Sequence, residues 1–214
     1  MSRRSAGFTL LEVLVATALL ATGLVVAFAS VRSAQAVAAR GEQTVAANER
    51  MRGVLDVLRA RLQAALPRGF EQTDDGLPPV RFDGEPQRLR FVADVPGYFG
   101  RGGPYLHQLQ VVRSPRGEGL RLELGLVLVH AGAQLPETPP RPPELLADGL
   151  RRVSFRYRGL DPMLGRSGDW QRDWRWADHL RPPQLVAISV EPLDGPAWPE
   201  LVVAIPQARP GAGR

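Results

Sequence analysis

A carboxylate stands at the start of a long apolar segment, where its charge demands a chemical explanation. Glu12 is followed by Val13 to Val31, a stretch that contains no charged residue. A stretch of this length and composition is typical of a helix that crosses a lipid bilayer. A charge inside a bilayer costs about 3 kcal/mol on insertion scales, so it is expected to have a function and a partner. Glu12 is therefore the first candidate functional residue of the chain.

The basic residues ahead of this segment indicate its orientation. Only Arg3 and Arg4 precede it, and basic flanks stay on the cytoplasmic side of a membrane. An ordinary secretory signal is the competing interpretation, with Ala27-Phe28-Ala29 or Ala34-Gln35-Ala36 as its cleavage site. The length of the apolar run and the carboxylate at its start argue against a simple signal. We therefore expect a single-pass protein whose N-terminus is cytoplasmic and whose remainder lies outside.

The residues around Glu12 resemble a known family. The segment from Gly7 to Ala16 reads Gly-Phe-Thr-Leu-Leu-Glu-Val-Leu-Val-Ala, which looks like the signature of type IV pilins and pseudopilins. The resemblance implies that a prepilin peptidase removes the basic leader, residues 1–7, by cutting between Gly7 and Phe8. It also implies N-methylation of Phe8, and it makes Glu12, now the fifth residue, the assembly glutamate. It places the chain in the inner membrane with a periplasmic C-terminal domain.

Electrostatics supports this role for Glu12. The resemblance implies that the new α-amino group on Phe8 of one subunit is a cation within an apolar bundle of helices. The Glu12 carboxylate of a neighbouring subunit could neutralise that cation, so two costly charges become one pair. Such a pair would set the axial register of a subunit as it joins a filament.

The sequence predicts one helix that continues beyond the membrane. No proline occurs between Met1 and Leu66, and Pro67 ends the run. We therefore expect a helix from Phe8 to Leu66, with residues 8–31 in the membrane and residues 32–66 in the periplasm. An apolar stripe at helical spacing predicts that the second part packs on a globular domain rather than forming a coiled coil. Its members are Met51, Val54, Leu55, Leu58, Leu62, Ala65 and Leu66; the possible weak points of the helix are Gly23, Gly41 and Gly53, of which Gly41 could permit a bend.

The remainder of the chain is expected to be rich in β-strands. Proline and glycine punctuate short apolar segments from residue 67 onward, and helix signals nearly vanish. A proline-rich connection runs from Pro136 to Pro143, and residues 206–214 form a flexible tail after a globular domain of residues 67–205. The candidate strands are Leu89–Ala93, Leu106–Arg113, Leu120–His130, Leu150–Tyr157, Gln184–Glu191 and Leu201–Ile205. The predicted fold class is α+β, a long N-terminal transmembrane helix packed on a strand-rich pilin-like domain.

Composition argues against several other classes of protein. The net charge is +5, and all 27 basic residues are arginine, but they are spread along the chain and interleaved with acids. A nucleic-acid surface would gather them on one face or in one run, so we expect no nucleic-acid partner. The chain has no cysteine, which excludes disulfides, cysteine metal ligands and cysteine nucleophiles.

No catalytic or metal-binding pattern is evident, so we expect a protein that is not an enzyme and holds neither cofactor nor metal. The histidines lack metal-ligand spacing, and the serines lack a nucleophile-elbow setting. The glycine-rich segment Gly100–Gly103 lacks the lysine and helix of a phosphate-binding loop. The acidic residues that could suggest a calcium loop are irregularly spaced among arginines. The residues considered are His107, His130 and His179, Ser114, Ser154, Ser167 and Ser189, and Asp161, Asp169, Asp173 and Asp178.

Three tryptophans cluster late in the chain. Trp170, Trp174 and Trp176 lie within one loop segment that is rich in arginine. They could anchor this long loop on the sheet, contribute to a subunit interface, or line a face that binds a sugar or a peptide. The first of these interpretations is the simplest, and the sequence leaves all three open.

The soluble part carries a second resemblance. The stretch Leu89–Ala93, the glycine-rich turn and the strand to Val112 look like the J-type minor pseudopilin of type II secretion, as does the order of Leu150–Tyr157, the tryptophan loop and Pro182–Val186. The resemblance implies a structural subunit at the pseudopilus tip, joined to I-type and K-type subunits and supporting export of folded proteins across the outer membrane. The H-type and major pseudopilins are further candidate partners.

Two alternatives remain at this point. The chain could be a minor pilin of a type IV pilus, which serves assembly, adhesion or motility and shares the N-terminal signature. It could also be a membrane-tethered periplasmic enzyme or binding protein, which would need a convergent polar cleft. The sequence shows no residues that promise such a cleft.

Overall fold

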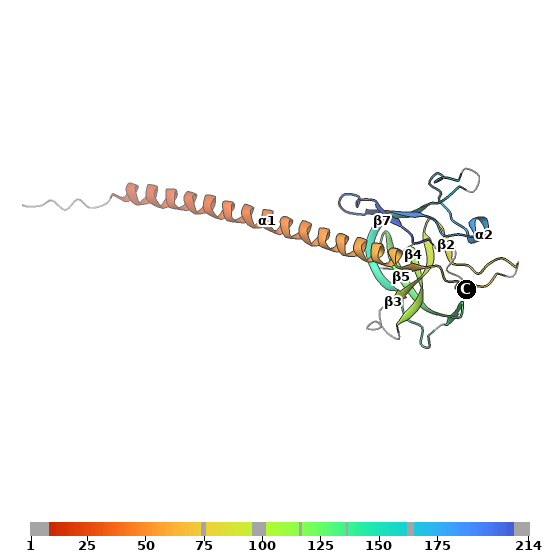
Figure 1. Ribbon diagram of the computed structural model, residues 1–214. Helices are drawn as coiled ribbons and strands as arrows, with labels where there is room; N and C mark the ends of the chain where they lie inside the picture. Colours follow the sequence, from red (N-terminus) through yellow and green to blue (C-terminus); the bar gives the residue numbers. More distant parts are fainter. Residues whose placement is uncertain are drawn as a thin grey trace, which may run out of the picture. The chain divides into compact units, whose positions relative to one another are not determined.

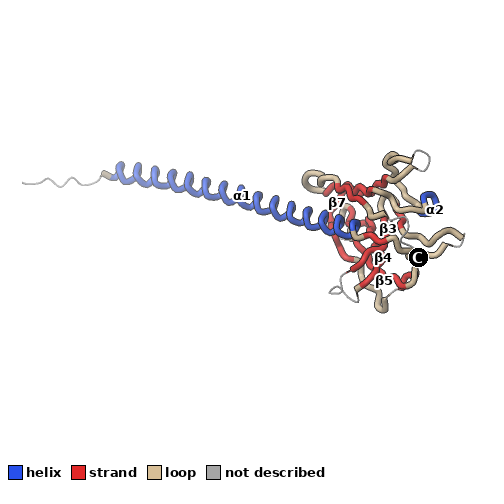
Figure 2. The backbone as a smooth tube through the Cα atoms, in the orientation of Figure 1, coloured by secondary structure: helices blue, strands red, loops and turns tan. Residues whose placement is uncertain are grey.

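The computed structural model describes residues 9–73, 76–95, 102–115, 117–135, 137–161 and 165–207, apart from the side chains of residues 34, 36, 37, 39 and 40. The chain divides into two compact units, residues 1–50 and 51–214, which are described separately. Figure 1 shows the elements in sequence colours, and Figure 2 separates helices from strands. The long helix α1 belongs to both units, and all the strands belong to the second.

Helix α1 spans Leu10–Gln63 and passes through all three glycines that the sequence marks as possible weak points. The prediction that it reaches Leu66 is wrong, because Ala65–Leu66 forms strand β1 instead. These two residues pair with Ala93 and Val92. Pro67 disfavours a helical conformation at the residue before it, and the neighbouring strand satisfies the backbone groups that leave the helix. The predicted start at Phe8 lies outside the described residues.

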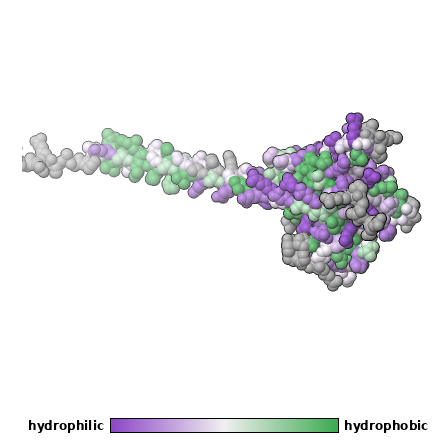
Figure 3. Space-filling view, in the orientation of Figure 1, coloured by the Kyte–Doolittle hydropathy of each residue, from purple (hydrophilic) through white to green (hydrophobic). Residues whose placement is uncertain are grey.

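The first unit contains a helical segment that could cross a membrane. Leu10–Ser33 has a mean hydropathy of 2.3, and none of its apolar window is buried in the structure. Hydrophobic residues accordingly cover most of the visible face of the first part of α1 in Figure 3. Three hydroxyl side chains in this segment donate hydrogen bonds to backbone carbonyls of the preceding turn. The hydroxyl groups are therefore hydrogen-bonded within the helix and do not require water. These are Thr17 to Leu14, Thr22 to Ala18 and Ser30 to Val26.

The second unit is built on one antiparallel sheet of nine strands in the described residues, with the order β1-β3-β4-β5-β7-β8-β9. Strand β2 also pairs with β3, and β6 also pairs with β5. The remaining bounds are β2 Phe82–Gly84, β3 Arg88–Val95, β4 Gly103–Arg113, β5 Leu120–His130, β6 Ala133–Leu135, β7 Glu144–Arg158, α2 Trp176–His179, β8 Leu185–Pro192 and β9 Leu201–Ala204.

The six predicted strands all exist, and β5 has the predicted bounds. Strands β1, β2 and β6 have only two or three residues, so they carry no alternation that a sequence could reveal. Strand β7 begins at Glu144 rather than Leu150, because its first part pairs with β5 through shifts in register. Such irregularities break the two-residue period and hide a strand from pattern analysis.

The second half of β7 leaves β5 and meets a different part of the chain. Tyr157 exchanges two backbone hydrogen bonds with Gln171, of 2.9 and 2.7 Å. Trp174 and Gly84 exchange two more, of 2.8 and 3.0 Å. The Tyr157 hydroxyl donates to the carbonyl of Glu85 at 2.8 Å. Residues 171–174 thus bond to β7 at one end and to β2 at the other. Because β2 pairs with β3, this segment connects β7 back to β3, at the two ends of the β3-β4-β5-β7 part of the sheet.

The end of α1 covers one face of this sheet. Leu58 and Leu62 are 1% and 0% exposed, and they belong to the same buried cluster as Phe91, Leu109 and Phe155. Each buried leucine contributes about 2 kcal/mol of hydrophobic stabilisation. The predicted apolar stripe is therefore confirmed from Met51 to Leu62 as the face of the helix that packs on the sheet, whereas Ala65 and Leu66 belong to β1.

A histidine lies within this core. His107 on β4 is fully buried, its ring is stacked on Phe91, and its Nδ1 lies 3.0 Å from the Tyr105 carbonyl oxygen. Its Nε2 has no hydrogen-bond partner. Burial lowers the pKa of His107 from 6.5 to about 4, and the charge of Arg61 on α1 acts in the same direction. The folded protein therefore keeps this imidazole neutral, because an imidazolium would be buried without a carboxylate.

This burial predicts an acid-dependent loss of stability. The unfolded chain binds a proton at His107 near pH 6.5 and the folded chain only near pH 4, so stability is full above pH 6.5 and falls as the pH drops towards 4. The loss amounts to about 3 kcal/mol across that range. The measurement is urea denaturation at pH 7 and at pH 4. Between these two pH values the free energy of unfolding of His107→Gln should fall less than that of the wild type, by the share that His107 contributes. His130→Gln, an exposed control, should keep the wild-type dependence; equal pH dependence in both variants would contradict the assignment.

Candidate functional site

The N-terminal end of α1 is capped by a hydroxyl side chain. The backbone N–H of Glu12 lies 3.3 Å from Oγ1 of Thr9 and 3.1 Å from its carbonyl oxygen. Threonine followed three residues later by glutamate has the spacing of a capping box, which starts a helix at a defined residue. This cap was not among the features predicted from the sequence, although the spacing of Thr9 and Glu12 signals it. The cap fixes the first turn of α1 and therefore the direction in which the Glu12 side chain leaves the helix.

Glu12 itself is exposed on the apolar helix. Leu11 and Val15 beside it are exposed as well, at 71% and 51%. Glu12 makes no ion pair with the described residues, whose salt bridges all lie from Asp56 onward. Gly7 and Phe8, the two other predicted site residues, lie outside the described residues. A carboxylate on an apolar helix, with no cation from the described chain, calls for a cation from elsewhere.

One network of charged groups joins strands β2 and β3 of the globular unit. Arg90 bonds to Asp83 at 3.0 Å and to Glu71 at 2.9 Å, and it lies over the ring of Phe70. This network holds strand β3 against β2 and against Glu71. Among the described residues, no group of three or more histidine, aspartate or glutamate side chains is placed to hold a metal ion.

The histidines and serines weighed in the sequence do not assemble into a catalytic arrangement among the described residues. His107 is sealed in the core, whereas His179 stacks on Trp174 with ring centroids 3.7 Å apart. Burial also lowers the pKa of His179. Ser167 donates a hydrogen bond to Gln184, and Ser189 donates one to Glu200. Both hydroxyls therefore take part in hydrogen bonds between side chains on the protein surface. Of the glycine-rich segment, residues 100 and 101 lie outside the described residues.

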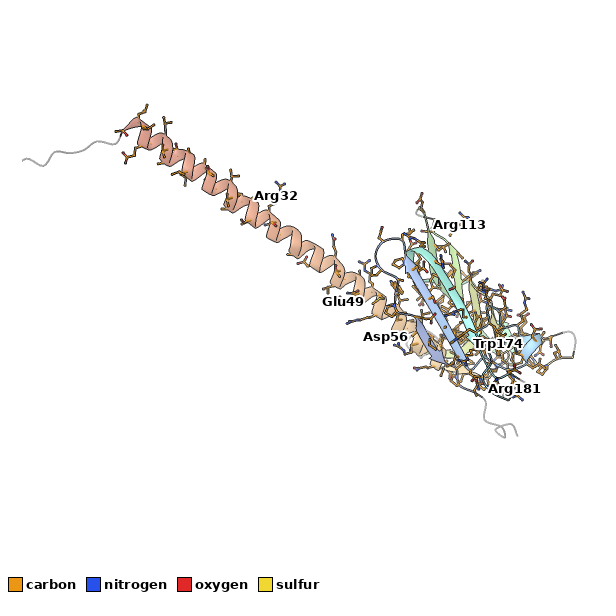
Figure 4. All side chains as sticks on the ribbon, turned by 90° about the horizontal axis from the view of Figure 1, so that it is seen from above. Arg32, Glu49, Asp56, Arg113, Trp174 and Arg181 are labelled. Atoms are coloured by element: carbon orange, nitrogen blue, oxygen red, sulfur yellow. The ribbon has the colours of Figure 1, made fainter. Side chains whose placement is uncertain are left out.

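Two of the three clustered tryptophans anchor the loop on the sheet. Trp174 and Trp176 are only 3% and 4% exposed. The indole N–H of Trp174 donates to the Arg181 carbonyl at 2.8 Å, and these two residues lie together in Figure 4. The indole of Trp176 donates to the Pro78 carbonyl at 2.8 Å. Both side chains therefore bury an apolar ring and satisfy its polar edge, as core tryptophans do.

The third tryptophan stays near the surface. Trp170 is half-buried, and the guanidinium of Arg156 lies 5.5 Å from its ring centre. This contact has the distance of a cation–π interaction. Of the interpretations left open by the sequence, loop anchoring accounts for Trp174 and Trp176, while Trp170 remains available to a partner.

Comparisons with known proteins identify the class first. The prokaryotic N-terminal methylation motif matches residues 2–28, which include the expected cleavage site and Glu12. Together with the apolar start of α1 and the strand-rich unit, this motif defines a membrane-anchored protein of the pilin class.

A relative then identifies the family. The chain is 49% identical over 211 residues to the type II secretion system protein J of Xanthomonas campestris pv. campestris, a match that covers 99% of this chain and 98% of the relative. The chain belongs to the family of type II secretion system protein J. This confirms the second resemblance found in the sequence, and it does not favour the type IV pilus alternative.

The different burial of the tryptophans gives a testable contrast. Trp174→Ala should lower the free energy of unfolding by about 3–5 kcal/mol, because it opens a cavity beside Gly159 and frees the Arg181 carbonyl. Trp170→Ala should cost less than about 1 kcal/mol, since it removes a half-buried ring and one cation–π contact. Thermal and urea denaturation of the two variants measure the difference. Equal losses in both would contradict the division into core and surface tryptophans.

Proposed function

We propose that this protein is a minor pseudopilin at the tip of the type II secretion pseudopilus. The observation that carries the proposal is the exposed Glu12 carboxylate at the capped start of an apolar helix, in a chain 49% identical to a J protein of this system. The partners in the tip are the I-type and K-type pseudopilins, with the H-type and major pseudopilins next along the filament. The tip primes filament assembly and so supports the export of folded proteins across the outer membrane.

The first step is maturation of the N-terminus. Prepilin peptidase cuts between Gly7 and Phe8 and removes the leader with Arg3 and Arg4, and Phe8 is then N-methylated. The methylation motif over residues 2–28 supports this processing. The arginines of the leader hold the N-terminus on the cytoplasmic side, so the strand-rich unit faces the periplasm. The protein is thus a single-pass protein of the inner membrane.

The second step is insertion into the filament by charge pairing. The amine of Phe8 and the carboxylate of Glu12 are both costly in lipid when alone. When the amine of one subunit meets Glu12 of its neighbour, each desolvated charge gains a partner at short range. The Thr9 cap holds the first turn of α1 in place. The Glu12 carboxylate therefore leaves the helix in a fixed direction and at a fixed position along the helix axis. The pair therefore selects one axial position for the incoming subunit.

The role proposed here is structural. The relative, which is a component of a secretion system, supports this role, and the buried Trp174 and Trp176 serve the packing of the fold. Energy for filament growth comes from a cytoplasmic ATPase and not from this chain.

Substitution of the glutamate tests the pairing. Glu12→Ala should be inserted and cleaved but should fail to assemble, because the neighbour's amine then stays unpaired. Glu12→Gln should fail similarly, since it keeps the size of the side chain and loses its charge. Secretion in cells that lack their own copy of the subunit measures assembly, and the intact mass of the mature chain reports cleavage and methylation. Glu42→Ala, on the same helix beyond the apolar segment, is the matched control. Normal secretion by Glu12→Ala would refute the pairing.

Co-purification tests the proposed place in the machine. The full chain, solubilised from membranes together with the I-type and K-type pseudopilins of the same genome, should yield a stable ternary complex. Recovery of neither partner, with capture of type IV pilus minor pilins instead, would contradict the assignment to a secretion tip.

A further inference from the structure

The buried ring of His107 lies on the face of the sheet that the end of α1 covers. Tyr105 and Leu109, two residues before and after it on β4, belong to the same buried cluster as Leu62 of the helix. Side chains two residues apart on a strand share a face, so His107 faces the helix as well. The charge of Arg61 on α1 acts on the ring from across this contact. The histidine is therefore part of the joint, by which we mean the contact of α1 residues 51–63 with the sheet.

The surroundings of the ring are unsuited to a positive charge. Strand β3 places Phe91 beside His107, and β5 places Leu126 there, and both are hydrophobic. The charged group that acts from α1 is Arg61, and β4 itself contributes Tyr105, whose carbonyl oxygen lies 3.0 Å from Nδ1. The other ring nitrogen, Nε2, has no hydrogen-bond partner among the described residues. A protonated ring would thus be a buried cation beside a second cation, which is a costly arrangement.

The helix is the part of these surroundings that can move without breaking strand pairing. Strand β4 is paired over most of its length with β3 on one side and with β5 on the other. The end of α1 contacts the sheet through apolar side chains such as Leu55, Leu58 and Leu62. Moving a strand would lose apolar contacts and a ladder of hydrogen bonds, whereas moving the helix end loses apolar contacts. Ala65 and Leu66 of β1 stay paired with β3 and tether the helix.

From this arrangement we propose that protonation of His107 opens the joint, so that the end of α1 separates from the sheet while strands β3, β4 and β5 stay paired. A buried cation gains water when the helix that covers it moves away. The acid-dependent loss of stability is thus directed to one contact before the rest of the fold. That contact attaches the globular unit to α1, so acid loosens the attachment. The effect occurs in the single chain and does not depend on its place in a filament.

The closed and the open joint bind a proton at different pH values. In the closed joint the pKa of His107 is about 4 because the ring is buried, whereas a ring in contact with water has a pKa of 6.5. A histidine whose pKa is lower in the closed state favours that state above pH 6.5, and this preference is lost as the pH falls towards 4. The equilibrium constant for opening should therefore rise about 100-fold between pH 7 and pH 4.

Amide hydrogen exchange of the full chain in detergent micelles tests which part opens. Exchange is followed at pH 7 and at pH 4, and each rate is divided by the intrinsic rate at that pH. The amides of residues 55–62 should lose about 100-fold in protection at pH 4, and they should then be less protected than those of Leu106–Leu109 on β4. Equal protection of α1 and β4 at pH 4 would mean that the whole domain opens as one unit, and it would refute the separate opening of the joint.

Replacement of the histidine tests the cause of the opening. His107→Gln should keep the same protection of residues 55–62 at both pH values, because its amide side chain does not titrate. His130→Gln, which removes an exposed histidine from the adjoining strand β5, should lose protection as the wild type does. A loss in His107→Gln as large as that in the wild type would overturn the assignment to this ring.

Charge reversal at Arg61 gives a second test that keeps His107 in place. Arg61→Glu supplies a carboxylate near the ring, so an imidazolium then has a partner in the closed joint. Arg59→Glu is the matched control, because Arg59 is exposed and pairs with Asp56 on the same helix. At pH 5, where glutamate is charged, protection of residues 55–62 should have fallen about 20-fold in the wild type and in Arg59→Glu, and less than about fivefold in Arg61→Glu. Equal losses in the two variants would contradict the opening at this joint.

Discussion

The fold of the globular unit depends on the contact between the end of α1 and the sheet. Leu58 and Leu62 are almost fully buried against strands that come from the whole length of the domain. A helix of α1's composition would be marginal in water without such a surface, because most helical stability in proteins comes from packing of an apolar face. The same contact encloses His107, whose pKa of about 4 reflects how completely water is excluded there. Through this packing the folded domain stays joined to the segment that carries Glu12.

The membrane segment follows a different physical rule. Its side chains are exposed in the structure of the single chain, and they need lipid or other helices around them. In those surroundings hydroxyl groups are satisfied by their own helix, as at Thr17 and Thr22, but a carboxylate is not. Under the proposed function, the Glu12 carboxylate is the group that assembly completes, and the amine of a neighbouring chain is the cation proposed to pair with it.

The covering of exposed strand edges explains much of the remaining architecture. The short strands β1, β2 and β6, and the bridge residues Gln171 and Trp174, add little core of their own. They form hydrogen bonds with backbone groups that the long strands would otherwise expose. Trp174 also holds its bridge to Gly84 in place, because its indole is buried in the core.

From the sequence by itself came the apolar segment, the six longer strands, the methylation motif and the candidate residue Glu12. These features depend on composition and on local periodicity, which a single chain displays directly. The end of α1 was predicted too late, because Ala65 and Leu66 are apolar and helix-compatible, and only pairing with β3 turns them into a strand. The start of β7 and the three short strands were missed for a similar reason, since bulges and two-residue pairings leave no period to read. The burial of His107 and the separate environments of Trp170 and Trp174 were decided by tertiary structure alone, because each depends on segments distant in the sequence.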